Sequence, residues 1–109
     1  MYASFTTTKG SVEGLSEVAA MAGEAMLVWL RESEGFEGLL ILTDDTTGTT
    51  RVITFWRDRE AEERNRESRM RLPDRMSETV EARVEETASY DVSFAHLGAK
   101  LAATRGQAD

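Results

Sequence analysis

The chain has 109 residues, no cysteine and a formal net charge of −7, so we expect one domain with one hydrophobic core. The lack of cysteine excludes disulfides, thiolate metal sites and thiol nucleophiles, and it is compatible with the cytoplasm, which we predict as the compartment. The acidic charge argues against a nucleic-acid partner, because duplex binding depends on basic side chains that neutralise phosphates. No apolar run approaches the roughly 18 residues of a membrane span, so no membrane association is predicted.

The N-terminal segment predicts a strand followed by a helix. Tyr2 to Thr8 is rich in β-branched and aromatic residues, and Lys9–Ser11 predicts a turn whose serine caps the next helix. From Val12 to about Ser33 the apolar spacing is helical, and Gly35 predicts a left-handed stop after it. The stripe that this helix should bury consists of Val12, Leu15, Ala19, Ala22, Met26, Trp29 and Leu30.

The segment from Gly35 to Trp56 predicts a β-hairpin that is apolar on both faces. Its strands, Gly38 to Thr43 and Thr50 to Trp56, are joined by a polar turn in which Gly48 supplies a positive φ. Within the strands, Leu39 and Ile41 alternate with Leu40 and Leu42, and Val52, Thr54 and Trp56 alternate with Ile53 and Phe55. A sheet in a small domain normally leaves one face to water, so two apolar faces need two covers. We expect helices on one face and a second copy of the chain on the other.

The charged segment after Trp56 predicts a second helix, with Asp58 as its cap. Pro73 should break it near Arg71–Leu72, because a proline inside a helix costs about 3 kcal/mol, and a second helical segment should begin around Asp74. Its thin buried side is expected to be Ala61, Met70, Leu72, Met76 and Val80. Its interleaved arginines and acidic residues, Glu62 and Arg66 among them, predict a solvated, ion-paired face.

The last predicted strand begins at Val84 or Glu85 and alternates through Phe94, with one polar face. The order strand, helix, strand, strand, helix, strand predicts an α+β fold: a ferredoxin-like βαββαβ domain with a four-stranded antiparallel sheet and both helices on one face. We place this domain at residues 1–96 and a fraying tail at 97–109. The uncovered apolar face predicts a homodimer that forms through the sheets.

One long run of the sequence resembles a known family. GFEGLLILTDDTTGTTRVITFWRDREAEERN, together with the later SYDVSFAH, is similar to the antibiotic biosynthesis monooxygenase domain of the dimeric α+β barrel superfamily. The resemblance covers roughly residues 2–96. The residues that carry it are Gly35, Phe36, Gly38, Gly48, Ile53, Phe55 and Trp56.

The resemblance implies subunits that pair through their sheets, each with a pocket between sheet and helices. The best-known members of the family oxidise polycyclic aromatic substrates with dioxygen and use no metal or prosthetic group, so no cofactor is expected. Relatives bind and cleave haem. Trp56 matches the strand-end tryptophan that both kinds of enzyme use. Val52 stands where the first kind has an assisting asparagine, and Ala3 and Arg66 stand where the second kind has an asparagine and a histidine.

The predicted ligand-binding set follows from this pocket and from the residues beside Trp56. It consists of Trp56, Val52, Thr54, Trp29, Met26, Met70 and Met76. The catalytic candidates are Trp56, which would position an aromatic ring, and Tyr90 and Arg66, which would stabilise an anion. For each of these residues there is also a structural interpretation, either as a packed core group or as part of an ion-paired surface. His96, the only histidine, has no neighbouring carboxylate in the sequence, and it predicts neither a metal site nor a catalytic triad.

Three functions remain open from the sequence. The leading one is cofactor-independent oxygenation of a small aromatic or polyketide-like substrate, with the protein supplying orientation, deprotonation and stabilisation of the substrate anion. The second is a non-catalytic ligand-binding or stress-related interaction module on the same dimeric barrel. The third is haem binding.

Overall fold

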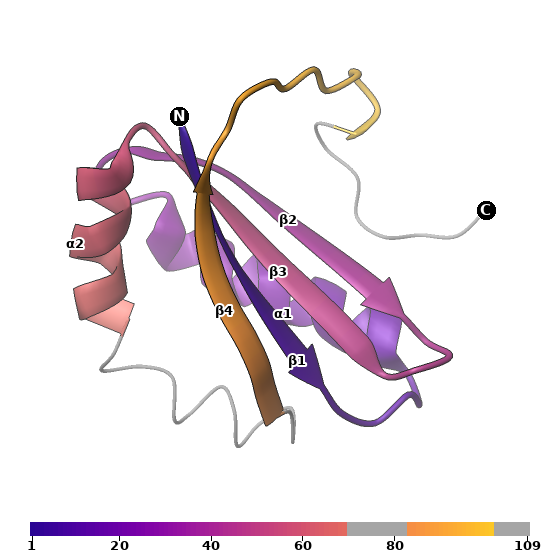
Figure 1. Cartoon of the computed structure of the whole chain (residues 1–109). Helices are drawn as coiled ribbons and strands as arrows, with labels where there is room; N and C mark the ends of the chain where they lie inside the picture. The colour runs from indigo at the N-terminus through magenta and orange to yellow at the C-terminus, as the bar shows by residue number, and fades with distance from the viewer. Residues whose placement is uncertain (70–82, 102–109) are drawn as a thin grey trace.

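The structure is a computed structural model that describes residues 1–69 and 83–101. In this part of the chain the elements follow the predicted βαββαβ order (Figure 1). They are β1 (Tyr2–Lys9), α1 (Leu15–Leu30), β2 (Phe36–Asp44), β3 (Thr49–Trp56), α2 (Arg59–Arg69) and β4 (Arg83–Asp91). The strands form one antiparallel sheet in the order β2-β3-β1-β4, so the first strand of the chain lies inside the sheet. This is the ferredoxin-like α+β fold that the sequence predicts.

Both helices pack on the same face of the sheet. Helix α1 lies against β2, and α2 lies against β1 and β3. The buried centre between the layers joins Met26 and Leu30 of α1 to Trp56 of β3 and Ala61 of α2. Trp56 and Leu30 have no exposed surface at all. Because the tryptophan is the largest of these side chains, it anchors the contact among both helices and the sheet.

The strand register sorts the side chains into two sets. Trp56 pairs with Tyr2, and Thr54 pairs with both Ser4 and Leu39, so these residues share the helix-covered face. On the opposite face, a row of paired residues crosses the whole sheet: Leu40, Ile53, Phe5 and Ala88. Among the described residues, no helix lies against this second face, which we call the open face. The packing of Trp56 thus decides which side of the hairpin faces the helices.

Several predicted boundaries shift, each for a local reason. Helix α1 begins at Leu15 rather than Val12, because Gly14 takes a left-handed conformation (φ 64°) just before it and the Ser11 hydroxyl instead accepts the N–H of Glu13. The helix also ends at Leu30, before the predicted Ser33. Strand β4 ends at Asp91 rather than Phe94, because Asp91 already pairs with Tyr2, the first residue of β1. One further bond follows, in which the Val92 N–H donates to the Met1 carbonyl at 3.0 Å.

Other local predictions are confirmed, with one exception. Gly48 has a φ of 76°, as expected for the hairpin turn. Gly35 has the expected left-handed conformation (φ 85°), but it is not the helix stop, because α1 already ends at Leu30 with Arg31 in a right-handed conformation. The carboxylate of Asp58 accepts the N–H of Ala61 at 2.9 Å and caps α2. The predicted break near Arg71–Leu72 and the helical segment from Asp74 lie outside the described residues. No helix in the described part of the chain is long and apolar enough to cross a membrane.

Candidate functional site

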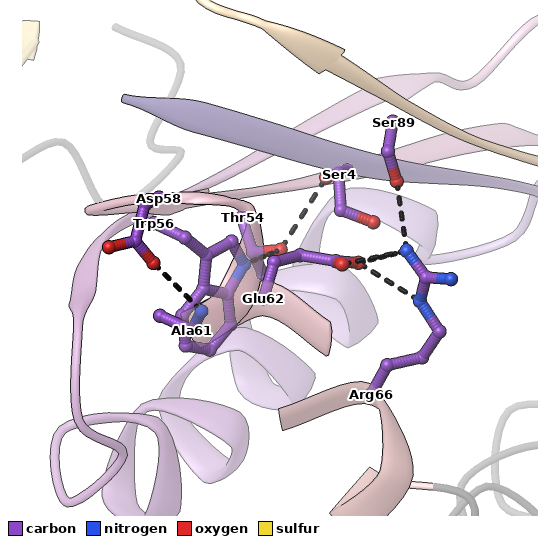
Figure 2. Close-up of polar contacts among 8 residues, drawn as sticks. All are labelled: Ser4, Thr54, Trp56, Asp58, Ala61, Glu62, Arg66 and Ser89. Carbon is purple, nitrogen blue, oxygen red and sulfur yellow. Dashed lines mark hydrogen bonds and ion pairs between the residues drawn. The ribbon is translucent and has the colours of Figure 1, made fainter. Parts of the chain in front are cut away.

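A group of polar side chains lies on the helix-covered face, where a hydrophobic core would be expected. We call Ser4, Thr54, Glu62, Arg66 and Ser89 the polar cluster (Figure 2). Ser4 on β1 pairs with Thr54 on β3 and with Ser89 on β4, so the register alone places three hydroxyl residues side by side across the sheet. Helix α2 adds Glu62 and Arg66, which lie one turn apart on one side of the helix.

Glu62 and Arg66 form a two-pronged ion pair. The Oε1 atom of Glu62 accepts from Nε of Arg66 at 3.1 Å and from Nη2 at 2.7 Å, and its Oε2 atom accepts from Nη2 at 2.7 Å. Glu62 is fully buried, whereas half of the Arg66 side chain is exposed. Hydrogen bonding to Glu62 raises the pKa of Arg66 above its ordinary value, so the guanidinium stays charged. The pair therefore presents a fixed guanidinium at the edge of a buried carboxylate.

The same guanidinium reaches the sheet. Nη2 of Arg66 also donates to the hydroxyl of Ser89 at 3.3 Å, which connects α2 to the edge strand β4. Figure 2 shows its remaining nitrogen, Nη1, without a contact to the other residues drawn. Within residues 1–69 and 83–101, the bonds of Nε and Nη2 thus hold Nη1 in a defined direction, from which it can donate to a ligand.

The burial of Glu62 contradicts the prediction of a solvated, ion-paired face on this helix. Glu62 has 0% exposed surface and Asn65 has 6%, next to Ala61 with 1%. The sequence carried one partial signal: Ala61 is the only apolar residue in the first turns of α2, and Asn65 lies one turn after it on the same side of the helix. That signal does not single out Glu62, since Glu60 flanks Ala61 equally and is exposed. A buried carboxylate needs a charged partner, and Arg66 one turn later supplies it.

Trp56 lies beside the polar cluster but within the core. Its Nε1–H donates to the hydroxyl of Thr54 at 2.9 Å, and that hydroxyl donates to the carbonyl of Ser4 at 3.5 Å. The ring of Phe36 meets the indole edge-on with centroids 5.6 Å apart. The indole is thus fully buried and satisfied at its nitrogen.

Asn65 links α2 to the segment that follows α1. Its Nδ2 donates to the Ser33 hydroxyl at 2.9 Å, and that hydroxyl donates to the Trp29 carbonyl at 3.3 Å. The Oδ1 atom of Asn65 is buried and has no partner among the described residues. These bonds fix the position of α2 against the end of α1, and with it the position of Glu62 and Arg66.

The structure brings together most of the predicted ligand-binding set and separates one catalytic candidate from it. Val52 and Thr54 share the face of Trp56, and Met26 and Trp29 of α1 pack against it. Tyr90 pairs with Ala3 and therefore lies on the open face, where its ring stacks on Phe5 with centroids 5.6 Å apart. Met70 and Met76 lie outside the described residues. Their ligand contacts, and those of the whole set, stay predictions.

His96 lies beyond β4 in an exposed position. Within residues 1–69 and 83–101, no group of three histidine, aspartate or glutamate side chains is arranged to hold a metal ion. The polar cluster itself combines hydroxyl groups with one buried negative and one half-exposed positive charge.

No protein-family model and no curated protein matches the sequence. Solved structures do match it. The monooxygenase ActVA-Orf6 of Streptomyces coelicolor, crystallised in complex with Nanaomycin D, is similar with a TM-score of 0.64 over 90% of this chain and 92% of its own, at 13% identity. A Deinococcus radiodurans protein assigned to the antibiotic biosynthesis monooxygenases is similar with a TM-score of 0.57 over 89% of this chain and 97% of its own, at 16% identity.

The chain has an antibiotic biosynthesis monooxygenase-like fold. At these identities the similarity concerns the fold, and it confirms the resemblance that the residues around Trp56 predict. Among the described residues, the polar cluster combines hydroxyl groups and a guanidinium next to a large aromatic core.

Proposed function

We propose that the protein is a cofactor-independent monooxygenase for a small aromatic or polyketide-like substrate. The observation that carries this proposal is the fold, which matches a monooxygenase solved with a bound ligand over nine tenths of both chains. The polar cluster supports it, since it places a charged donor beside aromatic and apolar groups, the surroundings that an aromatic substrate with polar substituents requires.

In such a reaction the substrate loses a proton and its anion passes electrons to dioxygen. One oxygen atom enters the substrate and the other leaves as water. The protein contributes by holding the ring and by stabilising the negative charge that develops on a substrate oxygen. Arg66 is the group of the polar cluster that fits the second task, because its half-exposed guanidinium is fixed by Glu62 and can donate an N–H bond to that oxygen.

Oxygen uptake tests the proposal directly. A panel of anthrones and hydroquinones should be oxidised faster with the protein than in buffer, and a chelator in the assay should leave that rate unchanged. The double variant Glu62→Gln/Arg66→Met, which leaves no unpaired buried carboxylate, should lose most of the rate, by roughly 10²-fold or more, because the guanidinium that stabilises the negative charge is gone. Arg64→Met, which changes an exposed arginine on the same helix, serves as the matched control. A panel that the protein leaves at the buffer rate would contradict oxygenation.

A second function, a non-catalytic ligand-binding or interaction module, is favoured by one observation. Trp56 is completely buried and its N–H is already bound by Thr54, which is how a structural tryptophan is held. This module would bind aromatic compounds saturably without any oxygen uptake, so a calorimetric titration run beside the oxygen electrode separates the two functions.

We further propose that two copies pair through the open face. That face carries Phe5, Leu40, Ile53 and Phe55, and its outer residues Leu42 and Tyr90 are 47% and 57% exposed in the single chain. A group of apolar residues of this kind on one face of a sheet is typical of an interface. A second copy is the simplest cover, since the same surface is then buried on both chains.

A further inference from the structure

The Glu62–Arg66 pair brings no net charge to the site that it forms. The buried carboxylate cancels the guanidinium, to which it is bound at 2.7 Å through both of its oxygens. The Glu62 carboxylate needs this partner, because an unpaired buried carboxylate is strongly unfavourable. Arg66 is therefore not available to leave Glu62 and pair with a different anion. What it offers a ligand is a directed N–H group.

This neutrality selects between classes of ligand. A carboxylate or phosphate ligand would set a second negative charge beside Glu62, in a chain whose formal net charge is already −7. A ketone or quinone oxygen accepts the same N–H bond and brings no charge. The neighbouring hydroxyl of Ser89, held at 3.3 Å by Nη2, keeps the guanidinium facing the sheet side of the site.

We propose that the Glu62–Arg66 pair is a specificity-determining unit that binds the neutral carbonyl oxygen of an aromatic ligand and disfavours anionic ligands. The inference rests on the proposed function only in taking the ligand to be aromatic. Arg66 makes the contact, and Glu62 positions it and sets the charge. In a reaction that moves electron density onto this oxygen, the N–H group is already in place to stabilise it.

Three simple probes test the inference: acetophenone, ethylbenzene and benzoate. They share the ring and differ in offering a neutral acceptor, no acceptor or a charged one. Binding is followed by NMR on the protein labelled with ¹⁵N, including the Nε–H signal of Arg66, which already bonds to Glu62 in the free protein. Acetophenone should bind about three- to tenfold more tightly than ethylbenzene, which is the effect of one hydrogen bond, and it should shift the Arg66 signal. Benzoate should bind most weakly.

Glu62→Gln isolates the role of the buried charge. It keeps the shape of the side chain and leaves the guanidinium with its full positive charge, so the affinity for benzoate should rise about tenfold and overtake that for acetophenone. Glu63→Gln is the matched control, because it changes the net charge equally at an adjacent, exposed position. Its probe affinities should equal those of the unmodified protein.

The inference is overturned if the unmodified protein binds benzoate as tightly as acetophenone, or if both glutamine variants raise benzoate affinity alike. If Glu62→Gln does not fold, the unmodified protein decides alone, by the order of its affinities for acetophenone, ethylbenzene and benzoate. Probe selectivity without oxygen uptake would support this inference while contradicting the monooxygenase proposal. Oxygen uptake without probe selectivity would support the monooxygenase proposal and contradict this inference.

Discussion

Thr54 illustrates how much depends on a single hydroxyl group in this fold. It is 1% exposed, and its hydroxyl accepts the indole N–H of Trp56 at 2.9 Å while donating to the carbonyl of Ser4. It therefore links the largest core side chain to the backbone of the neighbouring strand. Threonine also suits the strand, because β-branched residues fit its pleated surface.

Replacing Thr54 with valine should destabilise the protein by about 1–3 kcal/mol. Valine has nearly the same shape, but it leaves the buried indole N–H without an acceptor, and an unsatisfied buried donor has this cost. Urea denaturation monitored by tryptophan fluorescence measures the change. Thr50→Val, at a half-buried position on the same strand, should stay within about 0.5 kcal/mol. Equal losses in both variants would show that the hydroxyl of Thr54 is unimportant.

The sequence predicts Trp56, Thr54 and Val52 as neighbours because alternation within one strand is a local property. It does not predict the burial of Glu62, because burial there depends on how α2 meets β1 and β3. Tyr90 shows the same limit. Its alternation within the strand is visible in the sequence, but the face it occupies follows from pairing with β1, at the opposite end of the chain.

The capping residue of α2 makes the stability of this element depend on pH. Asp58 accepts the N–H of Ala61, and this bond lowers the pKa of Asp58 below its ordinary value of 3.8. A lowered pKa in the folded state means that the charged carboxylate stabilises the fold. That stabilisation is complete above the unfolded pKa and is lost as the pH falls through the folded pKa.

We expect Asp58→Asn to remove this pH dependence and to retain the cap. The asparagine oxygen accepts the same bond but does not titrate in this range. The difference in unfolding free energy between the original protein and the variant should shrink as the pH is lowered below 3.8, the ordinary value of the group. Asp45→Asn, at an exposed position in the hairpin turn, is the control. A difference that stays constant with pH would contradict the assignment of the cap.

The hairpin turn is the second element that depends on one position. Gly48 has a φ of 76°, its N–H donates to the Asp44 carbonyl, and its carbonyl accepts the N–H of Gly10 at 3.0 Å. A Cβ atom added there would overlap the Gly10 carbonyl oxygen. The turn between β2 and β3 is thus packed directly on the segment between β1 and α1.

Gly48→Ala should therefore destabilise the protein by more than the conformational strain of a positive φ alone. Gly14→Ala is the matched comparison, since Gly14 has a φ of 64° but nothing within 4 Å of an added Cβ. We expect Gly14→Ala to destabilise by roughly 1–2 kcal/mol, the conformational cost, and Gly48→Ala to exceed it by at least about 1 kcal/mol because of the clash. Thermal unfolding of both variants measures the difference. Similar melting temperatures would mean that the turn moves away from Gly10 at little cost.

At the scale of the whole molecule, the proposed dimer follows from the two apolar faces of the hairpin. Leu40 lies on the open face in the row with Ile53 and Phe5, so Leu40→Asp should place a charge in the centre of the interface. Sedimentation at micromolar concentration should show a dimer for the original protein and a monomer for this variant. Val28→Asp, at a 71% exposed position on α1, should remain a dimer. A stable monomer of the unmodified protein would refute the proposal.

The fold as a whole is predicted well from the sequence, because each element has a distinct period and the order βαββαβ admits few arrangements. The boundaries are predicted less well, since they depend on contacts between elements: β4 stops where β1 begins, and α1 starts where Gly14 allows it. The polar cluster is likewise poorly predicted from the sequence. It is assembled by cross-strand register and helix packing, neither of which a single strand or helix reveals.

The interior position of β1 also determines the order in which the sheet can be completed. Its residue Tyr2 pairs on one side with Trp56 and on the other with Asp91, so the second partnership joins opposite ends of the described chain. The β2–β3 hairpin closes a short loop at low entropic cost, whereas the β1–β4 pairing must close nearly the whole chain. We therefore expect folding to begin at the hairpin and to finish at β4. The hydrogen bond between Arg66 of α2 and Ser89 of β4 is then among the final contacts to form. The polar cluster is therefore complete only when the whole fold is complete.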